Sequence, residues 1–148
     1  IGHIIEMIKD IRKTNQKLDE DLFNQFLLKN MFDKKMRTLS GGTTQKVSAT
    51  IAFLFNPNIL ILDEPTAGLD PLASETLKEK IIAEKQKGKL ILITSHLLSE
   101  LDELISHVVF MNEGQVKFHK TIEDLKNTTG EQKISKAIAN VLKSTIHE

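Results

Sequence analysis

The feature that most constrains the fold is a pair of short, unbroken apolar runs with one helical segment between them. The runs are Asn58–Asp63 and Lys89–Thr94, and their length and composition are typical of strands in a parallel sheet that is buried on both faces. Between them, Asp70 can cap a helix whose first residue is Pro71, and Gly88 suits the left-handed residue after a helix end. The pattern predicts a strand–helix–strand unit of an α/β protein.

Polar side chains follow both predicted strands. A strand–helix–strand unit normally forms a right-handed crossover, so both strands bring their carboxyl ends to one edge of the sheet. Ligands of open α/β sheets bind along that edge. The first run ends in Asp63, Glu64 and Pro65, and the second is followed by Ser95 and His96. We therefore expect carboxylates and an imidazole at this edge.

The chain before this unit predicts helices. Two amphipathic helices have apolar faces made by Ile4, Ile5, Ile8 and Ile11 and by Leu22, Phe23, Phe26 and Leu27. A third helix opens at Leu39–Gly42 and ends before Asn56 and Pro57, because proline disfavours its continuation.

The chain after the unit predicts a hairpin between helices. We expect a helix around 97–104, strands at Val108–Met111 and Gln115–Phe118, a short helix capped by Thr121, and an amphipathic tail helix from Glu131. That tail helix packs either on this chain or on a partner, and the pattern alone leaves both open.

Composition narrows the class of function. Twenty basic and twenty acidic residues give zero net charge, and the chain has neither tryptophan nor tyrosine. The sequence also shows no basic stripe with interleaved aromatic residues, the pattern that single-stranded nucleic acids bind. It also lacks cysteine, which excludes disulfides and thiolate metal sites. No apolar run approaches the ~20 residues of a membrane-spanning helix.

The segment Leu39-Ser40-Gly41-Gly42 combines three features that suit a phosphate. Ser40 stands at a helix cap, the paired glycines allow close approach to the backbone, and the helix N-terminus offers unpaired N–H groups. The alternative is ordinary helix punctuation, in which serine caps and the glycines turn the chain.

The strand exits offer the second set of candidates. Asp63 suits Mg²⁺, which is held by one or two carboxylates, several waters and substrate phosphates, and Glu64 can then polarise an attacking water as general base. His96 can reach a terminal phosphate. The alternatives are a solvated acidic loop, a structural histidine and, for Asp70, a helix cap alone.

In this order the motifs resemble one family, the nucleotide-binding subunits of ABC transporters. Leu39–Thr43 resembles the signature, Ile59–Glu64 the Walker B strand, Ala67–Asp70 the D-loop and His96 the switch histidine. The resemblance implies an α/β fold: part of a P-loop NTPase (RecA-like) parallel sheet core with an N-terminal helical signature subdomain. It implies a helical subdomain at 1–56, the C-terminal part of the ATPase core at 57–130 and a tail helix at 131–148.

The resemblance also implies roles for these residues. Asp63 supports Mg²⁺ through water, Glu64 is the catalytic base, His96 contacts the terminal phosphate, and Asp70 communicates across a dimer. Leu39, Ser40, Gly41, Gly42 and Thr43 make up the signature, whose Ser40, Gly41 and Gly42 contact ATP held by the opposite subunit.

Two departures from the family pattern stand out. The fifth signature position is Thr43 rather than glutamine, although Gln45 and Lys46 resemble the usual continuation. No glycine, four residues, then Gly-Lys-Ser/Thr occurs in these 148 residues, and the glutamine loop is also missing. The interpretation is a C-terminal fragment of an active subunit, which alone binds ATP weakly and hydrolyses it negligibly.

The expected function is therefore ATP hydrolysis that powers transport through separate transmembrane permease subunits. The expected assembly is a head-to-tail homodimer or a pair with a paralogous ATPase subunit, at the inner face of the cell membrane in the cytoplasm, without nucleic acid. Two alternatives stay open: an ABC-type ATPase that acts on nucleic acid or ribosomes, and a non-catalytic interaction module.

Overall fold

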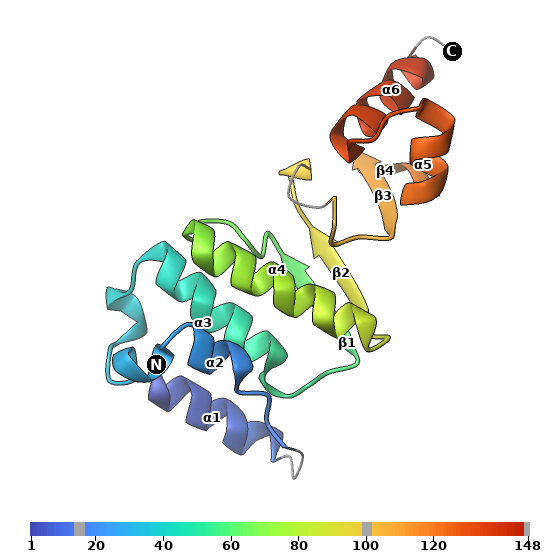
Figure 1. Ribbon diagram of the computed structural model, residues 1–148. Coiled ribbons are helices and arrows are strands. Elements are labelled where there is room, and N and C mark those ends of the chain that lie inside the picture. Colours follow the sequence, from blue (N-terminus) through green and yellow to red (C-terminus); the bar gives the residue numbers. More distant parts are fainter. Residues whose placement is uncertain (14–16, 99–101, 147–148) are drawn as a thin grey trace. The chain divides into compact units, whose positions relative to one another are not determined.

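The computed structural model describes residues 1–13, 17–98 and 102–146 and divides into two compact units, Ile1–Ser95 and His96–Glu148 (Figure 1). The first unit contains α1 (Gly2–Arg12), α2 (Asp21–Gln25), the 3-10 turns η1 (Leu28–Met31) and η2 (Met36–Thr38), α3 (Gly41–Leu54), β1 (Ile59–Asp63), α4 (Pro71–Gln86) and β2 (Leu90–Thr94). The second contains β3 (His107–Asn112), β4 (Gln115–Thr121), α5 (Ile122–Thr129) and α6 (Ile134–Ile146). The three-part division at residues 56 and 130 stays a prediction.

The two predicted strands of the first unit pair in parallel. Ile59 lies opposite Leu90 and Asp63 lies opposite Thr94, with no shift of register between them. Both strands thus end at the same edge, as the strand–helix–strand pattern predicts.

The prediction that this sheet is buried on both faces is wrong for the described residues. Leu60 and Leu62 are buried, but on the other face Ile59, Ile61, Leu90 and Leu92 are 55–72% exposed. A continuous apolar run predicts that both faces of a strand are buried, but it does not tell which element covers each face. Among the described residues, helices cover only one face of this sheet.

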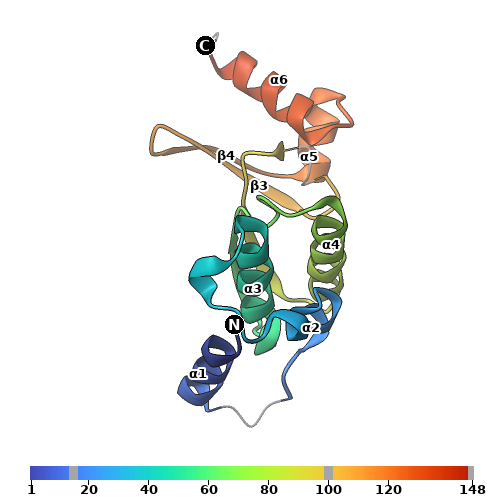
Figure 2. The same cartoon turned by 90° about the vertical axis from the view of Figure 1, so that its left-hand side faces the viewer.

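Helices α3 and α4 run roughly parallel to each other in both views (Figures 1 and 2). Each begins at the cap that the sequence predicts: the Ser40 side chain accepts a hydrogen bond from the Thr43 N–H at 3.2 Å, and Asp70 Oδ1 accepts from the Ala73 N–H at 2.9 Å. Their apolar faces form the centre of the unit, in which Val47, Phe53, Leu77 and Ile81 are essentially inaccessible to water.

The first two helices are predicted correctly in place but not in every contact. Ile5 and Leu22 are buried, whereas Ile11 and Leu27 are largely exposed. Leu27 adopts a left-handed conformation with φ of 52°, which ends the helical segment before the predicted face is complete. Helical spacing predicts which side of a helix is apolar. It does not predict whether a packing neighbour extends far enough to cover residues near the helix end, such as Ile11 and Leu27.

One buried carboxylate organises the charges of the first unit. Glu84 of α4 has no exposed side-chain surface and forms ion pairs with Lys80 (3.3 Å), Lys87 (2.7 Å) and Lys89. Lys80 also pairs with Asp19 at 2.7 Å and Asp21 at 3.3 Å. This network joins the segment before α2 to α4 and to the start of β2.

Burial alone would raise the pKa of the Glu84 carboxyl, but hydrogen bonds from Lys87, Lys89 and Lys80 lower it to about 2. For Lys80, burial alone would lower the pKa, and the hydrogen bond and charge of Asp19 more than offset that effect and raise it. Glu84 and Lys80 therefore both stay charged across the physiological pH range.

The second unit is a hairpin with two helices. Strands β3 and β4 are antiparallel, and the turn residues Glu113 and Gly114 both have positive φ, 50° and 72°, as a tight two-residue hairpin turn requires. Thr121 caps α5 by accepting from the Asp124 N–H at 2.9 Å. The hairpin and the Thr121 cap are confirmed.

The tail helix α6 packs within its own unit. Its residues Ile134, Ala137 and Ile138 are buried in one cluster with Leu125 of α5, and Phe110 and Phe118 of the hairpin pack against that cluster. The structure thus answers the question of where the tail helix docks.

The helix expected around 97–104 falls partly outside the described residues. On either side of 99–101, Leu98 has a 3-10 conformation and 102–104 form a hydrogen-bonded turn. Among the helices that the structure describes, none has both the length and the apolar content needed to cross a bilayer.

The one-sided sheet predicts opposite results for neighbouring residues. Leu62→Ala should cost about 2–4 kcal/mol of unfolding free energy because it leaves a cavity, whereas Ile61→Ala, at a side chain 72% exposed, should cost less than about 1 kcal/mol. Urea denaturation of the two variants measures the difference. Equal losses would show that the second face is covered as well.

The Glu84 network predicts a specific dependence on pH. Because the folded-state pKa of about 2 lies below the ordinary value of 4.5, the stability that Glu84 contributes is complete above pH 4.5 and is lost as the pH falls toward 2. Glu84→Gln should cost about 3 kcal/mol at pH 7 and should unfold with a flatter pH dependence between 5 and 3. The matched control is Glu79→Gln on the exposed side of α4, and equal pH profiles for the two variants would contradict the prediction.

Candidate functional site

The carboxyl edge of the parallel pair carries two oxygen-bearing side chains side by side. Asp63 and Thr94 are register partners, and the Thr94 hydroxyl donates a hydrogen bond to Asp63 Oδ1. Asp63 is exposed, so its carboxylate is accessible to a hydrated cation. The Thr94 hydroxyl orients it from the neighbouring strand.

Glu64 begins a tight turn directly after β1. Its N–H donates to the Thr94 carbonyl at 3.0 Å, which extends the strand pairing by one bond, and its carbonyl accepts from the Ala67 N–H at 3.0 Å. Its φ is 43°, in the left-handed region that costs a non-glycine residue about 1–2 kcal/mol. The backbone thus redirects the chain at the residue that is the expected catalytic base.

The signature residues form the N-terminus of α3. Ser40 Oγ lies 2.8 Å from Thr43 Oγ1 as well as capping the Thr43 N–H, and the Thr44 hydroxyl donates to the Ser40 carbonyl at 3.1 Å. Leu39 precedes this cap, half-buried. Thr43 therefore takes part in the cap itself, through its hydroxyl as well as its backbone N–H.

The start of α3 lies against the loop that follows β1, and we call this line of contacts the signature seam. It joins Gly42, Gln45 and Lys46 to residues 64–70. A Cβ atom on Gly42 would lie 2.5 Å from the carbonyl oxygen of Gly68, whereas one on Gly41 would meet nothing within 4 Å. Only glycine fits at position 42 without a shift.

The other two seam residues supply polar contacts. Gln45 Nε2 donates to the backbone carbonyls of Glu64 at 3.1 Å and Pro65 at 3.0 Å. Lys46 Nζ lies 2.6 Å from Asp70 Oδ2. The hydrogen bond from Lys46, together with the Ala73 N–H, lowers the pKa of Asp70, so the D-loop carboxylate is held ionised while it caps α4.

The structure therefore brings most of the predicted site into one body. Ser40, Gly42, Glu64 and Asp70 all belong to the first unit and are linked by the seam or lie within two residues of it. His96 is exposed and begins the second unit, two residues after β2 ends.

Sequence reasoning missed three contributors to this site. Thr94 orients Asp63, Gln45 binds the turn at Glu64, and Lys46 pairs with Asp70. Gln45 and Lys46 resemble the family's usual continuation of the signature, but that resemblance assigns neither residue a contact. Helical spacing offers one signal for them, since Gln45 and Lys46 lie one turn after Gly41 and Gly42 on the same side of α3.

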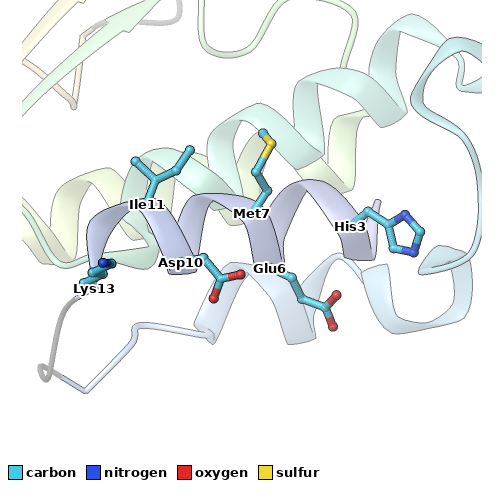
Figure 3. A pocket seen from close by; sticks show the side chains of 6 residues that line it. All are labelled: His3, Glu6, Met7, Asp10, Ile11 and Lys13. Carbon is cyan, nitrogen blue, oxygen red and sulfur yellow. The ribbon is translucent and has the colours of Figure 1, made fainter.

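A separate hollow of 530 Å³ lies on the outer surface of the first helix. Its described lining residues all come from α1 and the residue that follows it, with Met7 and Ile11 on one side and Glu6 and Asp10 on the other (Figure 3). It contains none of the signature or strand-exit residues, so it is distinct from the candidate site.

Comparisons with known proteins agree with this arrangement. The profile of the family described as ABC transporter matches residues 6–67. The lantibiotic transport ATP-binding protein SrtF of Streptococcus pyogenes is 36% identical over 106 residues, 72% of this chain and 46% of its own length. The chain belongs to the ABC transporter family of ATP-binding proteins. It spans about half the length of that bacterial relative, and 6% of the human phospholipid-transporting ATPase ABCA3, to which it is 35% identical over 75% of its own length.

Solved structures confirm the predicted fold class. The structure of an ATP-binding subunit of an ABC transporter superposes with a TM-score of 0.74 at 31% identity, covering 82% of this chain and 51% of that one. A chain from the complex of archaeal ribosomal stalk protein aP1 and archaeal ribosome recycling factor aABCE1 superposes with a TM-score of 0.61 at 28% identity, covering 75% of this chain and 23% of that one. The chain thus has the α/β fold of P-loop NTPases, together with a helical segment that carries the signature.

The residues at the carboxyl edge suit the magnesium ion that this ATPase family implies. Mg²⁺ keeps several waters and is bound by one or two carboxylates together with the phosphates of its nucleotide. The exposed Asp63 carboxylate with its Thr94 partner offers oxygen donors of that kind. The residues present thus fit such an ion, and Asp63 is the one that would hold it.

The two signature glycines give a matched pair for experiment. Gly42→Ala should cost about 1–3 kcal/mol of unfolding free energy, because its methyl group would collide with the Gly68 carbonyl. Gly41→Ala should leave stability unchanged or raise it by up to about 1 kcal/mol, since alanine is the better helix former. Thermal unfolding of both variants checks this. Equal destabilisation would mean that the seam does not set the requirement at position 42.

Proposed function

We propose that this chain is part of the ATP-hydrolysing subunit of an ABC transporter, which powers transport across a membrane through separate transmembrane permease partners. The observation that carries the proposal is the signature seam. It joins the signature helix, the exit of the Walker B strand and the D-loop carboxylate within the first unit, and these are three of the parts that ATP hydrolysis in this family requires.

In the proposed reaction each residue has a defined task. Asp63 would hold a magnesium ion through water, and that ion would supply the positive charge that neutralises the ATP phosphates. Glu64 accepts a proton from the water that attacks the terminal phosphorus as its bond to the ADP oxygen breaks, and the His96 imidazole contacts that phosphate. The chain itself supplies the orientation: Thr94 holds the Asp63 carboxylate, and the turn at residue 64 fixes the backbone that carries the base.

The proposed assembly is a head-to-tail dimer, either of identical subunits or with a paralogous one, on the cytoplasmic side of the membrane. Ser40, Gly41 and Gly42 then contact ATP held by the opposite subunit, where the helix N-terminus favours an anion. Asp70 communicates across the dimer. The signature N-terminus supports this arrangement because Ser40 and Gly41 are exposed and nothing lies within 4 Å of a Cβ atom on Gly41.

We do not expect this chain to act on nucleic acid or ribosomes, or to be a non-catalytic interaction module. The similarity to the ribosome recycling factor supports the ATPase body rather than a ribosomal role, because the net charge of zero and the absence of tryptophan and tyrosine argue against binding nucleic acid. A non-catalytic interaction module would have no need of an intact Glu64, and this difference can be tested.

Glu64→Gln should abolish hydrolysis while leaving ATP binding intact, because the amide is nearly isosteric but cannot accept the proton. We expect kcat in the ATPase subunit that carries this chain to fall by roughly 100-fold or more. The assay is phosphate release, with nucleotide binding measured in parallel, and the control is Glu79→Gln on the exposed face of α4. A Glu64→Gln subunit that hydrolyses ATP like the parent would refute the enzymatic proposal.

A further inference from the structure

The side chain of Gln45 makes an unusual contact for a helix residue. Its amide Nε2 donates to two successive backbone carbonyls, those of Glu64 at 3.1 Å and Pro65 at 3.0 Å. Gln45 is half-buried, and Pro65 is buried. Both carbonyls belong to the turn between β1 and the D-loop, so one side chain of the signature helix binds the turn that carries the expected catalytic base.

That turn needs to be held. Glu64 has a φ of 43°, and a non-glycine residue keeps such a backbone only where its surroundings fix it. Two of the restraining bonds come from the backbone: the Glu64 N–H donates to the Thr94 carbonyl, and the Ala67 N–H donates to the Glu64 carbonyl. Gln45 adds a contact from a separate helix, and it acts on the peptides on both sides of Pro65.

The position of these peptides decides where the Glu64 carboxylate lies. A rotation of the 64–65 peptide turns the Cα–Cβ bond of Glu64 and displaces its carboxylate at the end of the side chain. A general base works only within hydrogen-bond reach of the proton that it accepts, and displacements of about 1 Å can cost on the order of 100-fold in rate.

We propose that Gln45 is a positioning residue for ATP hydrolysis, which holds the left-handed turn at Glu64 in its productive form by donating to the carbonyls of residues 64 and 65. The inference rests on the proposed function, since it assigns Glu64 as the base. Gln45 does not touch the reacting atoms; it acts through the backbone of Glu64.

The neighbouring seam contacts connect this role to the position of the signature helix. Gly42 touches the Gly68 carbonyl region and Lys46 pairs with Asp70, so three residues of α3 contact one continuous loop. A movement of the signature helix is therefore transmitted to the loop through three contacts. The contact of Gln45 is the one made with the backbone of the expected base, Glu64. With Ser40–Gly42 on the nucleotide of the opposite subunit, the seam links occupancy of one site to the geometry of the other.

Three substitutions at this position separate positioning from simple stabilisation. Gln45→Met keeps the length and removes the donor, Gln45→Lys keeps a donor on a slightly longer chain, and Gln45→Asn keeps the amide but shortens its reach. The matched control is Gln86→Met, at an exposed glutamine of the last turn of α4. All are made in the ATPase subunit that carries this chain, beside Glu64→Gln.

We expect Gln45→Met and Gln45→Asn to lower kcat for ATP by about 10-fold or more with KM for ATP within about twofold of the parent, because nucleotide contacts are unchanged. Gln45→Lys should recover at least part of kcat, and Gln86→Met should match the parent. Amide hydrogen exchange at Ala67, whose N–H is bonded to the Glu64 carbonyl, should quicken in the Met and Asn variants while exchange in the middle of α4 stays the same. This second measurement does not depend on activity.

The outcomes separate the two proposals. If Glu64→Gln loses hydrolysis but Gln45→Met and Gln45→Asn keep kcat within twofold, the positioning role is wrong and the ATPase proposal stands. If Glu64→Gln hydrolyses ATP like the parent, the ATPase proposal itself fails. A Gln45→Met variant that unfolds leaves the decision to Gln45→Asn, and unchanged exchange at Ala67 in a folded variant would also overturn the positioning role.

Discussion

The contact between the N-terminus of α3 and the loop after β1 is the constraint on which the candidate site depends. Gly42 permits the approach, Gln45 binds the turn, and Lys46 pairs with the carboxylate that begins α4. The residues that face a neighbouring nucleotide in our proposal lie on one side of this contact, and those that face the chain's own nucleotide lie on the other. A short helix start and a seven-residue loop thus carry most of the proposed chemistry.

Features governed by local chemistry were predictable from the sequence. The caps at Ser40, Asp70 and Thr121 depend on side chains that bond a backbone N–H three residues away, and the parallel pairing of the two apolar runs follows from the helix between them. The hairpin turn needs positive φ at two adjacent residues, which Gly114 signals. In each case the residues that cause the structure are close together in the chain.

Features that depend on distant neighbours were not predictable in the same way. The apolar face with Ile59 and Ile61 and the end of α1 at Ile11 are exposed because no described element of the first unit covers them. Hydrophobic periodicity cannot report whether a covering element is present. The role of Gln45 was missed for a related reason, since its two acceptors lie about twenty residues away and are backbone atoms, which leave no mark in sequence composition.

The buried carboxylate of Glu84 has a consequence for how this protein tolerates sequence change. Three lysines, at positions 80, 87 and 89, share the one anion, so the loss of any single cation leaves the charge neutralised by the others. The loss of the anion has less reserve: Lys80 keeps Asp19 and Asp21 as partners, but Lys87 and Lys89 lose the carboxylate that they share. The network therefore tolerates substitution of one lysine better than substitution of Glu84.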